Sequence, residues 1–349
     1  MSKKIKLGDT ATFINGYAFK PADRGEVGLP IIRIQDLTGN AYDLGFYEGE
    51  YPEKIEINDG DVLISWSASL GVYVWNRGKA LLNQHIFKVV FDKVDINKQY
   101  FVYAVKYKLA EMTSKTHGAT MKHIVKKDFD ATEIPYPNME QQKEITNVLN
   151  KAAFVVDTRK KELRKLDELI KARFVELFGD YHINDKGFES HKGSELFKFS
   201  SGKFLPEENR LDKGIPVYGG NGIVWYTDSS LVDYPTVIIG RVGAWCGNVH
   251  MVTEPVWITD NAIYIKEQKT NKFTLEFLTE LMKVMDFHQY ADFSGQPKIT
   301  QKPLETLEYL TPPVEMQNEF TDFVHQVDKS KFKKITTTNI YCFTHMRSS

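Results

Sequence analysis

Cysteine is scarce in this sequence of 349 residues, and long apolar runs are lacking. The two cysteines, Cys246 and Cys342, lie far apart and without the spacing of metal ligands, which excludes a disulfide framework and a cysteine-based zinc site. No run of about 18 apolar residues is present, so no segment is expected to span a membrane. The first residues also lack the apolar core of a signal peptide. We therefore expect a cytoplasmic protein.

Motifs of the common nucleotide and metal enzymes are lacking as well. The sequence has no G-x-x-x-x-G-K-[ST] loop, no H-E-x-x-H motif and no Asn-Pro-Pro-aromatic tetrapeptide, and its nine histidines are scattered. The stretch GGNG at 219–222 lacks the strand-to-helix context of a dinucleotide site and is expected to be a turn. We therefore expect no catalytic residue, no metal and no cofactor in this chain.

An excess of positive charge is also absent. Lysine and arginine total 45 against 46 acidic residues, so the net charge is -1. A protein that only coats DNA is usually strongly basic, because phosphate neutralisation dominates its affinity. The total charge alone therefore does not favour a nucleic-acid partner. The length suits two domains with cores of their own.

What the sequence does contain is a long internal repeat. Its matched segments are FING at 13–16 with FSSG at 199–202, 28–37 with 213–222, 61–75 with 235–249, 117–137 with 294–313, and PNMEQQKEI at 137–145 with PPVEMQNEF at 312–320. The order is preserved, and the offset shrinks from 186 residues (16 to 202) to 175 residues (142 to 317). Shorter surface loops in the second copy explain the shrinkage.

Each copy is predicted to be a compact α+β unit. Runs rich in β-branched and aromatic residues alternate with turn residues, and one helix per copy follows, at 99–112 and 274–285. No βαβ rhythm is present, so a doubly wound nucleotide fold is excluded. We expect two tandem similar α/β domains, 1–138 and 180–313, separated by a long coiled-coil-type helix.

The separating segment, 139–179, has neither proline nor glycine from Met139 to Phe178, and Gly179 suits a C-terminal cap. Steps of four and three from Ile145 give a heptad seam with two arginine interruptions, which favours pairing with another helix over burial against its own domain. The residues expected to face a partner helix are Ile145, Leu149, Val156, Leu163, Leu166, Ile170 and Leu177.

The second helical region is predicted to be truncated or altered. By the repeat it should begin at 314, yet after Asp328 the chain reads KSKFKKITTTNIYCFTHMRSS. Three consecutive threonines stand where helix formers are expected, and the heptad is lost. We expect a helix over 314–332 and an atypical tail over 333–349, from a replaced or frame-shifted end.

Two similar halves, each followed by a helix that opens with P-x-x-E-x-Q, resemble the specificity subunits of Type I restriction-modification systems. The likeness rests on Pro137–Gln142 with its heptad, on Pro312–Glu319, on the paired strands near 61–66 and 235–241, and on the turns at Gly118 and Gly295. It covers residues from about 5 to about 330.

The resemblance implies two target-recognition domains, each of which reads one half of a split, asymmetric sequence in double-stranded DNA. It also implies docking of DNA-methyltransferase (modification) subunits, which use S-adenosylmethionine, and of restriction/translocase subunits, which use ATP and Mg, in phage defence. At a rise of ~1.5 Å per residue the helix 139–178 exceeds one DNA turn, roughly 34–36 Å. Such a helix would set the separation of the two readers.

The residues expected to contact DNA lie in a basic loop around Gly118, after one strand of the first copy, and at aligned positions of the second copy. Trp66 and Trp245 are expected to occupy corresponding hairpins, where they either stack on a base or brace the loop. The full set is Arg33, Gln35, Asp36, Trp66, Lys115, His117, Thr120, Lys122, His123, Lys126, Lys127, Tyr218, Asn221, Arg241, Trp245, Asn248, Gln296 and Lys298.

Two other functions remain open from the residues. A metal-dependent DNA endonuclease would use the nearest acidic cluster, Glu50, Asp59 and Asp61. A duplicated binding module for a protein or glycan would use the plentiful aromatic residues, 17 tyrosines and 22 phenylalanines.

Overall fold

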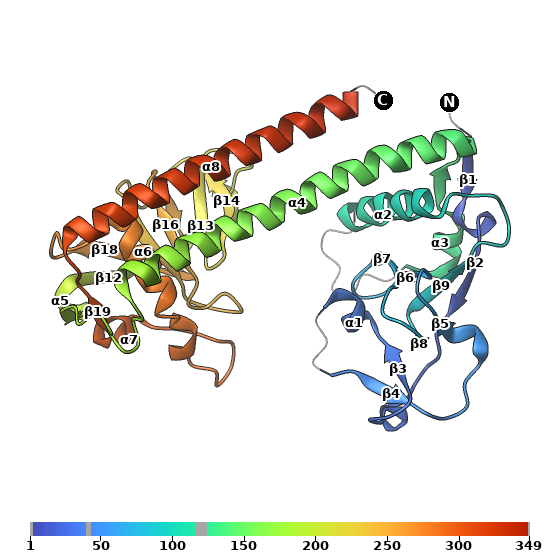
Figure 1. Ribbon diagram of the computed structural model, residues 1–349, viewed down its shortest axis with the longest axis horizontal. Helices are drawn as coiled ribbons and strands as arrows, with labels where there is room; N and C mark the ends of the chain where they lie inside the picture. The colour runs from blue at the N-terminus through green and yellow to red at the C-terminus, as the bar shows by residue number, and fades with distance from the viewer. Residues whose placement is uncertain (1–2, 40–42, 116–123, 348–349) are drawn as a thin grey trace. The chain divides into compact units, whose positions relative to one another are not determined.

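The computed structural model describes residues 3–39, 43–115 and 124–347, with side chains described at 3–39, 43–112 and 124–333. The chain forms two compact units, Met1–Phe154 and Val155–Ser349, whose boundary falls inside one long helix, α4 (Met139–Phe178). Each unit holds one copy of the sequence repeat (Figure 1). None of the described helices has the length and apolar character needed to cross a membrane.

The larger sheet of the first unit is antiparallel and carries one long helix. Its inner strand β6 (Val62–Ser65) is buried on both faces, and its first three residues are apolar: Val62 and Ile64 pack toward Phe101 of the helix. Leu63, on the opposite face, packs in a second cluster with Trp75. In sheet order the strands are β2 (Thr12–Asn15), β9 (Ile86–Val90), β6 (Val62–Ser65) and β7 (Gly71–Val74), and the helix is α2 (Lys98–Lys115).

A smaller mixed sheet covers the other face of β6. Its two inner strands are parallel, which places Ile31 beside Leu81. In sheet order the strands are β4 (Gly45–Tyr47), β3 (Leu29–Ile32), β8 (Ala80–Leu82) and β5 (Glu56–Ile57).

The second unit repeats this arrangement, including the parallel pair, in which Val217 lies beside Trp257. The larger sheet has the order β12 (Phe197–Ser201), β18 (Ala262–Gln268), β15 (Thr236–Gly240) and β16 (Val249–Val252). The smaller sheet has the order β14 (Gly222–Thr227), β13 (Ile215–Gly219) and β17 (Trp257–Ile258), and the helix is α6 (Leu275–Val284). The tandem α+β prediction is confirmed.

In each unit a two-stranded ribbon joins the beginning of the domain to its end. The ribbons are β1 (Lys4–Lys6) with β10 (Glu133–Pro135), and β11 (Ser190–Lys192) with β19 (Glu308–Leu310). The short helices are α1 (Ile34–Thr38), α3 (Lys126–Ala131), α5 (Gly193–Leu196) and α7 (Gln301–Thr306).

Helix α4 has the predicted bounds, and Gly179 ends it with φ of +74°. Within the second unit its C-terminal half packs against α8 (Val314–Arg347). The rings of Phe174 and Phe320 lie 5.6 Å apart, and Asp167 forms a 2.8 Å ion pair with Lys331.

The predicted seam is only partly correct. Leu166, Ile170 and Leu177 do pack in the core that α4 shares with α8, and Leu149 and Leu163 are half-buried. However, the most buried aromatic residues of α4 are Phe174 and Phe178, which the seam leaves out, and Ile145 and Val156 are 39% and 36% exposed. Residues 166, 170, 174 and 178 are four apart, which suits a helix packed on a domain core better than a strict heptad pair.

The expected end of the second helix near residue 332 is wrong for the backbone. Helix α8 continues to Arg347, through the three threonines. Threonine costs only about 0.5 kcal/mol per residue relative to alanine in a helix interior, which a helix of 34 residues tolerates. The side chains of 334–349 lie outside the described residues.

Candidate nucleic-acid interface

The end of strand β15 brings separate segments of the second unit together. The N–H of Arg241 donates to the carbonyl of Asn261 at 2.9 Å, and the carbonyl of Arg241 accepts from the N–H of Ile299 at 2.9 Å. Next to it, Val242 forms a β-bridge with Lys298. The loop 241–248 and the segment 291–299 therefore lie side by side. We call this meeting point the strand-end junction.

The turn between β13 and β14 approaches the same junction. A Cβ added to Gly240 would lie 2.7 Å from the carbonyl oxygen of Gly220, so the two backbones touch and glycine is needed for the approach. Asn221 follows in the turn and is exposed. The segment 219–222 is thus a turn, as predicted.

Uncommitted hydrogen-bond donors gather at the junction. Nη1 of Arg241 donates to the carbonyl of Asp260 at 3.2 Å, and no carboxylate among the residues with described side chains forms an ion pair with it. Lys298 and Gln296 are exposed, and a Cβ added to Gly243 would lie 3.3 Å from Nε2 of Gln296. Guanidinium, ammonium and amide donors suit phosphate oxygens and the acceptor edges of bases.

The first unit has the same junction with a different side chain. The N–H of Trp66 donates to the carbonyl of His85 at 3.2 Å, and its carbonyl accepts from the N–H of Ile124 at 3.0 Å. These two hydrogen bonds make Trp66 the counterpart of Arg241. Trp66 and Trp245 do lie in corresponding hairpins, as expected, but not at equivalent positions, because the loop after β15 runs from 241 to 248 whereas the loop after β6 runs only from 66 to 70.

The two tryptophans have different surroundings. The indole of Trp66 stacks on Phe87 with centroids 5.6 Å apart, and its Nε1 donates to Oδ1 of Asn15 at 3.4 Å. Trp66 therefore braces the core. Trp245 is 53% exposed and borders a hollow of about 280 Å³ that His288 and Lys283 also line. Of the two, Trp245 is the one whose ring is available to a partner.

Tyr218 and Asn248 pack within the domain next to the junction and hold its loops in place. Tyr218 is half-buried, burial raises its pKa, and its ring lies 6.1 Å from that of His250. The carbonyl of Asn248 accepts from the N–H of Gly240 at 2.7 Å, which closes the loop. Burial lowers the pKa of His250 and keeps this imidazole neutral.

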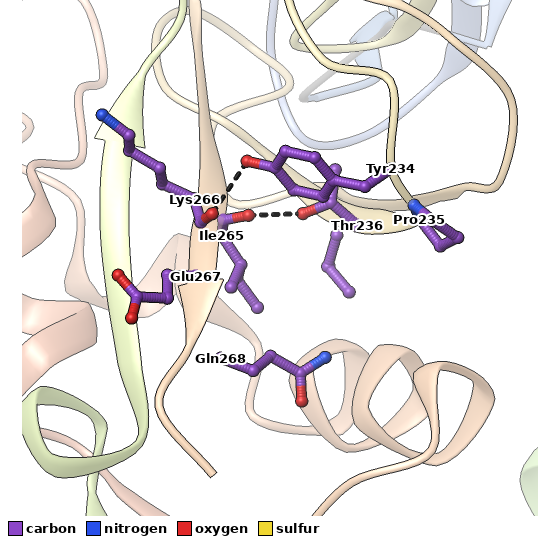
Figure 2. Close-up of a pocket in the computed structure, with 8 residues that line it drawn as sticks. Tyr234, Pro235, Thr236, Ile265, Lys266, Glu267 and Gln268 are labelled. Atoms are coloured by element: carbon purple, nitrogen blue, oxygen red, sulfur yellow. Dashed lines mark hydrogen bonds between the residues drawn. The ribbon is translucent and has the colours of Figure 1, made fainter. Parts of the chain in front are cut away.

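A depression of about 270 Å³ lies at the other end of β15, where Thr236 begins the strand (Figure 2). The hydroxyl of Tyr234 donates to the carbonyl of Lys266 at 2.8 Å, and that of Thr236 donates to the carbonyl of Ile265 at 2.7 Å. Both hydroxyl hydrogens are thus committed to the sheet, and burial raises the pKa of Tyr234. This depression presents fewer open donors than the junction.

Comparison with known proteins identifies the family. A family model described as "Type I restriction modification DNA specificity domain" matches residues 2–167 and again 185–340. The chain belongs to this family. The two matches coincide with the two copies of the repeat, so each unit carries one specificity domain.

Individual relatives agree with the assignment. The chain is 29% identical over 171 residues to the EcoBI specificity subunit of Escherichia coli, a match that covers 48% of this chain and 36% of that protein. It is 25% identical over 319 residues to the EcoprrI specificity subunit of Escherichia coli, covering 83% of this chain and 77% of the relative. A third match, 24% identical to the MjaVIII specificity subunit of Methanocaldococcus jannaschii, covers 54% of this chain and 49% of that protein.

The fold is also shared with a solved structure. The type I restriction-modification S subunit from M. genitalium superposes with a TM-score of 0.54 at 16% identity, over 99% of this chain and 94% of that one. The matches to EcoBI and MjaVIII span less than half of those proteins.

Among the predicted residues of the first specificity domain, Arg33 and Asp36 bind each other. Nε of Arg33 lies 3.2 Å from Oδ2 of Asp36, and a second carboxylate, that of Asp43, lies 3.4 Å from the guanidinium. Asp36 is buried and accepts the N–H of Arg33 at 2.8 Å, so it caps helix α1. Gln35 lies in the same short helix and is exposed. This arginine is neutralised within the domain.

The basic loop is only partly described. Lys126 and Lys127 begin helix α3 and are exposed, and Nζ of Lys126 forms a 2.6 Å ion pair with Asp130. The predictions for His117, Thr120, Lys122 and His123 and for the side chain of Lys115 lie outside the described residues. Their proposed contacts stay predictions.

The acidic cluster considered for a nuclease serves turns and ion pairs. Oδ1 of Asp59 accepts from the N–H of Gly78 at 2.7 Å, and Asp61 forms a 3.2 Å ion pair with Lys88. Where the chain is described, no three His, Cys, Asp or Glu side chains are grouped to hold a metal ion. The geometry gives Asp59 and Asp61 a structural use.

Sequence reasoning missed two features of the site. Asp43, which neutralises Arg33, lies ten residues after it in the sequence, and no motif links the two residues. His250 lies in an ordinary strand, and only the approach of Tyr218 and Gly222 to its ring shows its position under the turn. The repeat itself was the usable signal, since it located the strand-end junction in both copies.

Proposed function

We propose that this chain is the DNA-reading specificity subunit of a type I restriction-modification system. Each unit would read one half of a bipartite, asymmetric target in double-stranded DNA. One observation carries the proposal. At the strand-end junction the two units hold equivalent backbone in place with the same two hydrogen bonds, yet they present tryptophan in one unit and arginine in the other.

A shared frame with different side chains suits the recognition of two different half-sites. Sequence is read by side chains at base edges, whereas phosphate contacts set the register of the protein on the duplex. The exposed Lys298 and Gln296 and the unneutralised Arg241 supply donors for both tasks. A local group of this kind is compatible with a net charge of -1.

The chemistry would belong to partner subunits. We propose that modification subunits, which use S-adenosylmethionine, dock on the helical regions, and that ATP- and Mg-dependent restriction subunits join them. In this assignment the chain has no catalytic residue. Its helices α4 and α8 would act as spacer and docking platform.

A binding titration at several salt concentrations tests the proposal. The purified chain should retard a pool of random 40-base-pair duplexes and enrich one bipartite sequence from it. Affinity should fall steeply with salt because bound counterions are released from the phosphates. Adenine methylation mapped in cells with and without the gene should reveal the same bipartite sequence. Absence of both enrichment and methylation at any such motif would contradict the proposal.

A further inference from the structure

The side chain at the strand-end junction has a different task in each unit. The main-chain groups of Arg241 are both used, by Asn261 and Ile299, as those of Trp66 are used by His85 and Ile124. The backbone position is therefore fixed, and only the side chain is free to vary. In the first unit that side chain packs on Phe87 and lies partly buried against the core.

Arg241 also differs from three other arginines near the small sheets. Arg24 pairs with Asp43 at 2.9 Å, Arg33 pairs with Asp36 and Asp43, and Arg210 pairs with Glu207 at 3.1 Å. A guanidinium already held by a carboxylate gains little from a base. Arg241 donates to a carbonyl, that of Asp260, so most of its fork of donors is uncommitted among the residues with described side chains.

Its neighbours orient this fork instead of neutralising it. The hydrogen bond to the Asp260 carbonyl at 3.2 Å holds one arm of the guanidinium, and the contact of Gly220 with Gly240 holds the turn beside it. Lys298 stands on the adjoining segment as an exposed ammonium on a flexible stem, which suits a phosphate. An oriented planar fork suits the paired acceptors O6 and N7 of guanine in the major groove.

We propose that Arg241 reads a guanine in the half-site bound by the second unit, and that Trp66 reads no base in the other half-site. This inference rests on the proposed function and adds to it a residue and a base. Arg241 thus determines specificity at one base pair, whereas Lys298 contributes affinity without base preference.

Selection from a randomised duplex pool tests the assignment with the full-length chain. Bound and unbound duplexes are sequenced for the native protein, for Arg241→Gln, for Arg241→Lys and for the control Lys298→Ala. The native protein should prefer guanine at one position of one half-site. In Arg241→Gln that preference should fall by roughly 5- to 150-fold, which is the discrimination of a bidentate contact. Preferences at all other positions should be unchanged.

The variants separate the possible outcomes. Arg241→Lys keeps the charge but not the planar fork, so it should weaken the guanine preference while it retains the salt dependence. This variant replaces Arg241→Gln in the test if Arg241→Gln does not fold. Lys298→Ala should bind more weakly and keep every base preference. Retention of the guanine preference in both Arg241 variants would overturn the inference while the proposed function stands. Failure of the native protein to select any sequence would overturn both.

Discussion

Gln142 in the first unit and Gln317 in the second share two equivalent hydrogen bonds. Oε1 of Gln142 accepts from the N–H of Asn97 at 2.9 Å, and Oε1 of Gln317 accepts from the N–H of Thr274 at 2.9 Å. Each Nε2 donates to the carbonyl of the proline that opens its P-x-x-E-x-Q segment, at 2.9 Å in both cases. The two side chains are 1% and 0% exposed. The motif glutamine therefore fixes each long helix to the start of the helix that covers the sheet.

Replacement of this glutamine should destabilise the unit that holds it. Gln142→Ala leaves the Asn97 N–H and a carbonyl buried without their partner, which costs about 2–3 kcal/mol. The exposed neighbour Gln141 provides the control, since Gln141→Ala should cost less than about 1 kcal/mol. Urea unfolding of both variants measures the difference. Equal losses would show that the buried amide is not an anchor.

The two tryptophans should respond oppositely to removal. Trp66→Ala removes an indole packed on Phe87 and should cost about 2–4 kcal/mol. Trp245→Ala should change stability by less than about 0.5 kcal/mol because the ring is 53% exposed. It should instead weaken DNA binding. Thermal unfolding and gel retardation of both variants check the pair, and a large stability loss in Trp245→Ala would contradict the assignment.

Charge at the junction should set part of the salt dependence. Lys298→Ala should reduce the slope of log K against log salt by about 0.9, the contribution of one phosphate contact. Arg33→Ala should leave the slope unchanged, because Asp36 and Asp43 already neutralise that guanidinium. Binding titrations at about 50, 100 and 200 mM salt measure both slopes. A reduced slope in Arg33→Ala but not in Lys298→Ala would show that Arg33, and not Lys298, contacts a phosphate.

Stability should fall in mild acid through His250. Burial lowers the pKa of this imidazole in the folded protein, and its Nε2 has no hydrogen-bond partner in the described structure. The unfolded chain takes up a proton as the pH falls through about 6.5, whereas the folded chain does not. Stability is therefore fully present above that pH and is lost below it, at up to about 1.4 kcal/mol per pH unit. His250→Gln should remove this part of the pH dependence in unfolding curves at pH 7.5 and 5.5.

Lengthening α4 should lengthen the spacer of the DNA target. Seven residues inserted between the exposed Lys160 and Lys161 preserve the helix face and add about 10 Å, or about three base pairs. The two half-site sequences should stay the same. Selection from a randomised duplex pool measures both. An unchanged spacer would show that α4 does not set the separation of the readers.

Local patterns predicted much of the fold. The absence of proline and glycine gave α4 its bounds, and the strands expected near 61–66 and 235–241 are β6 and β15. Which residues of α4 are most buried did not follow from the heptad, because the helix packs on the aromatic core around Phe174 and Phe178. A seam calculated along one helix cannot anticipate the shape of the surface it meets.

The candidate site was predicted less completely. Counting offsets placed Trp66 and Trp245 in corresponding hairpins, which the strand pairing confirms. The count could not give the equivalent position, because the second loop is longer, and the strand-end hydrogen bonds make Arg241 the counterpart of Trp66. The neutralisation of Arg33 depends on Asp43, which approaches only through the pairing of β3 with β4. Pairings between strands carry the information that a single sequence lacks.

The two hydrogen bonds at Arg241 come from its main chain alone, so a change of residue type there leaves the scaffold intact. A single codon change at position 241 would then alter one base of the half-site that the second unit recognises. The first unit and the helices would stay unchanged. Novelty in targeting would then arise without a refolding cost.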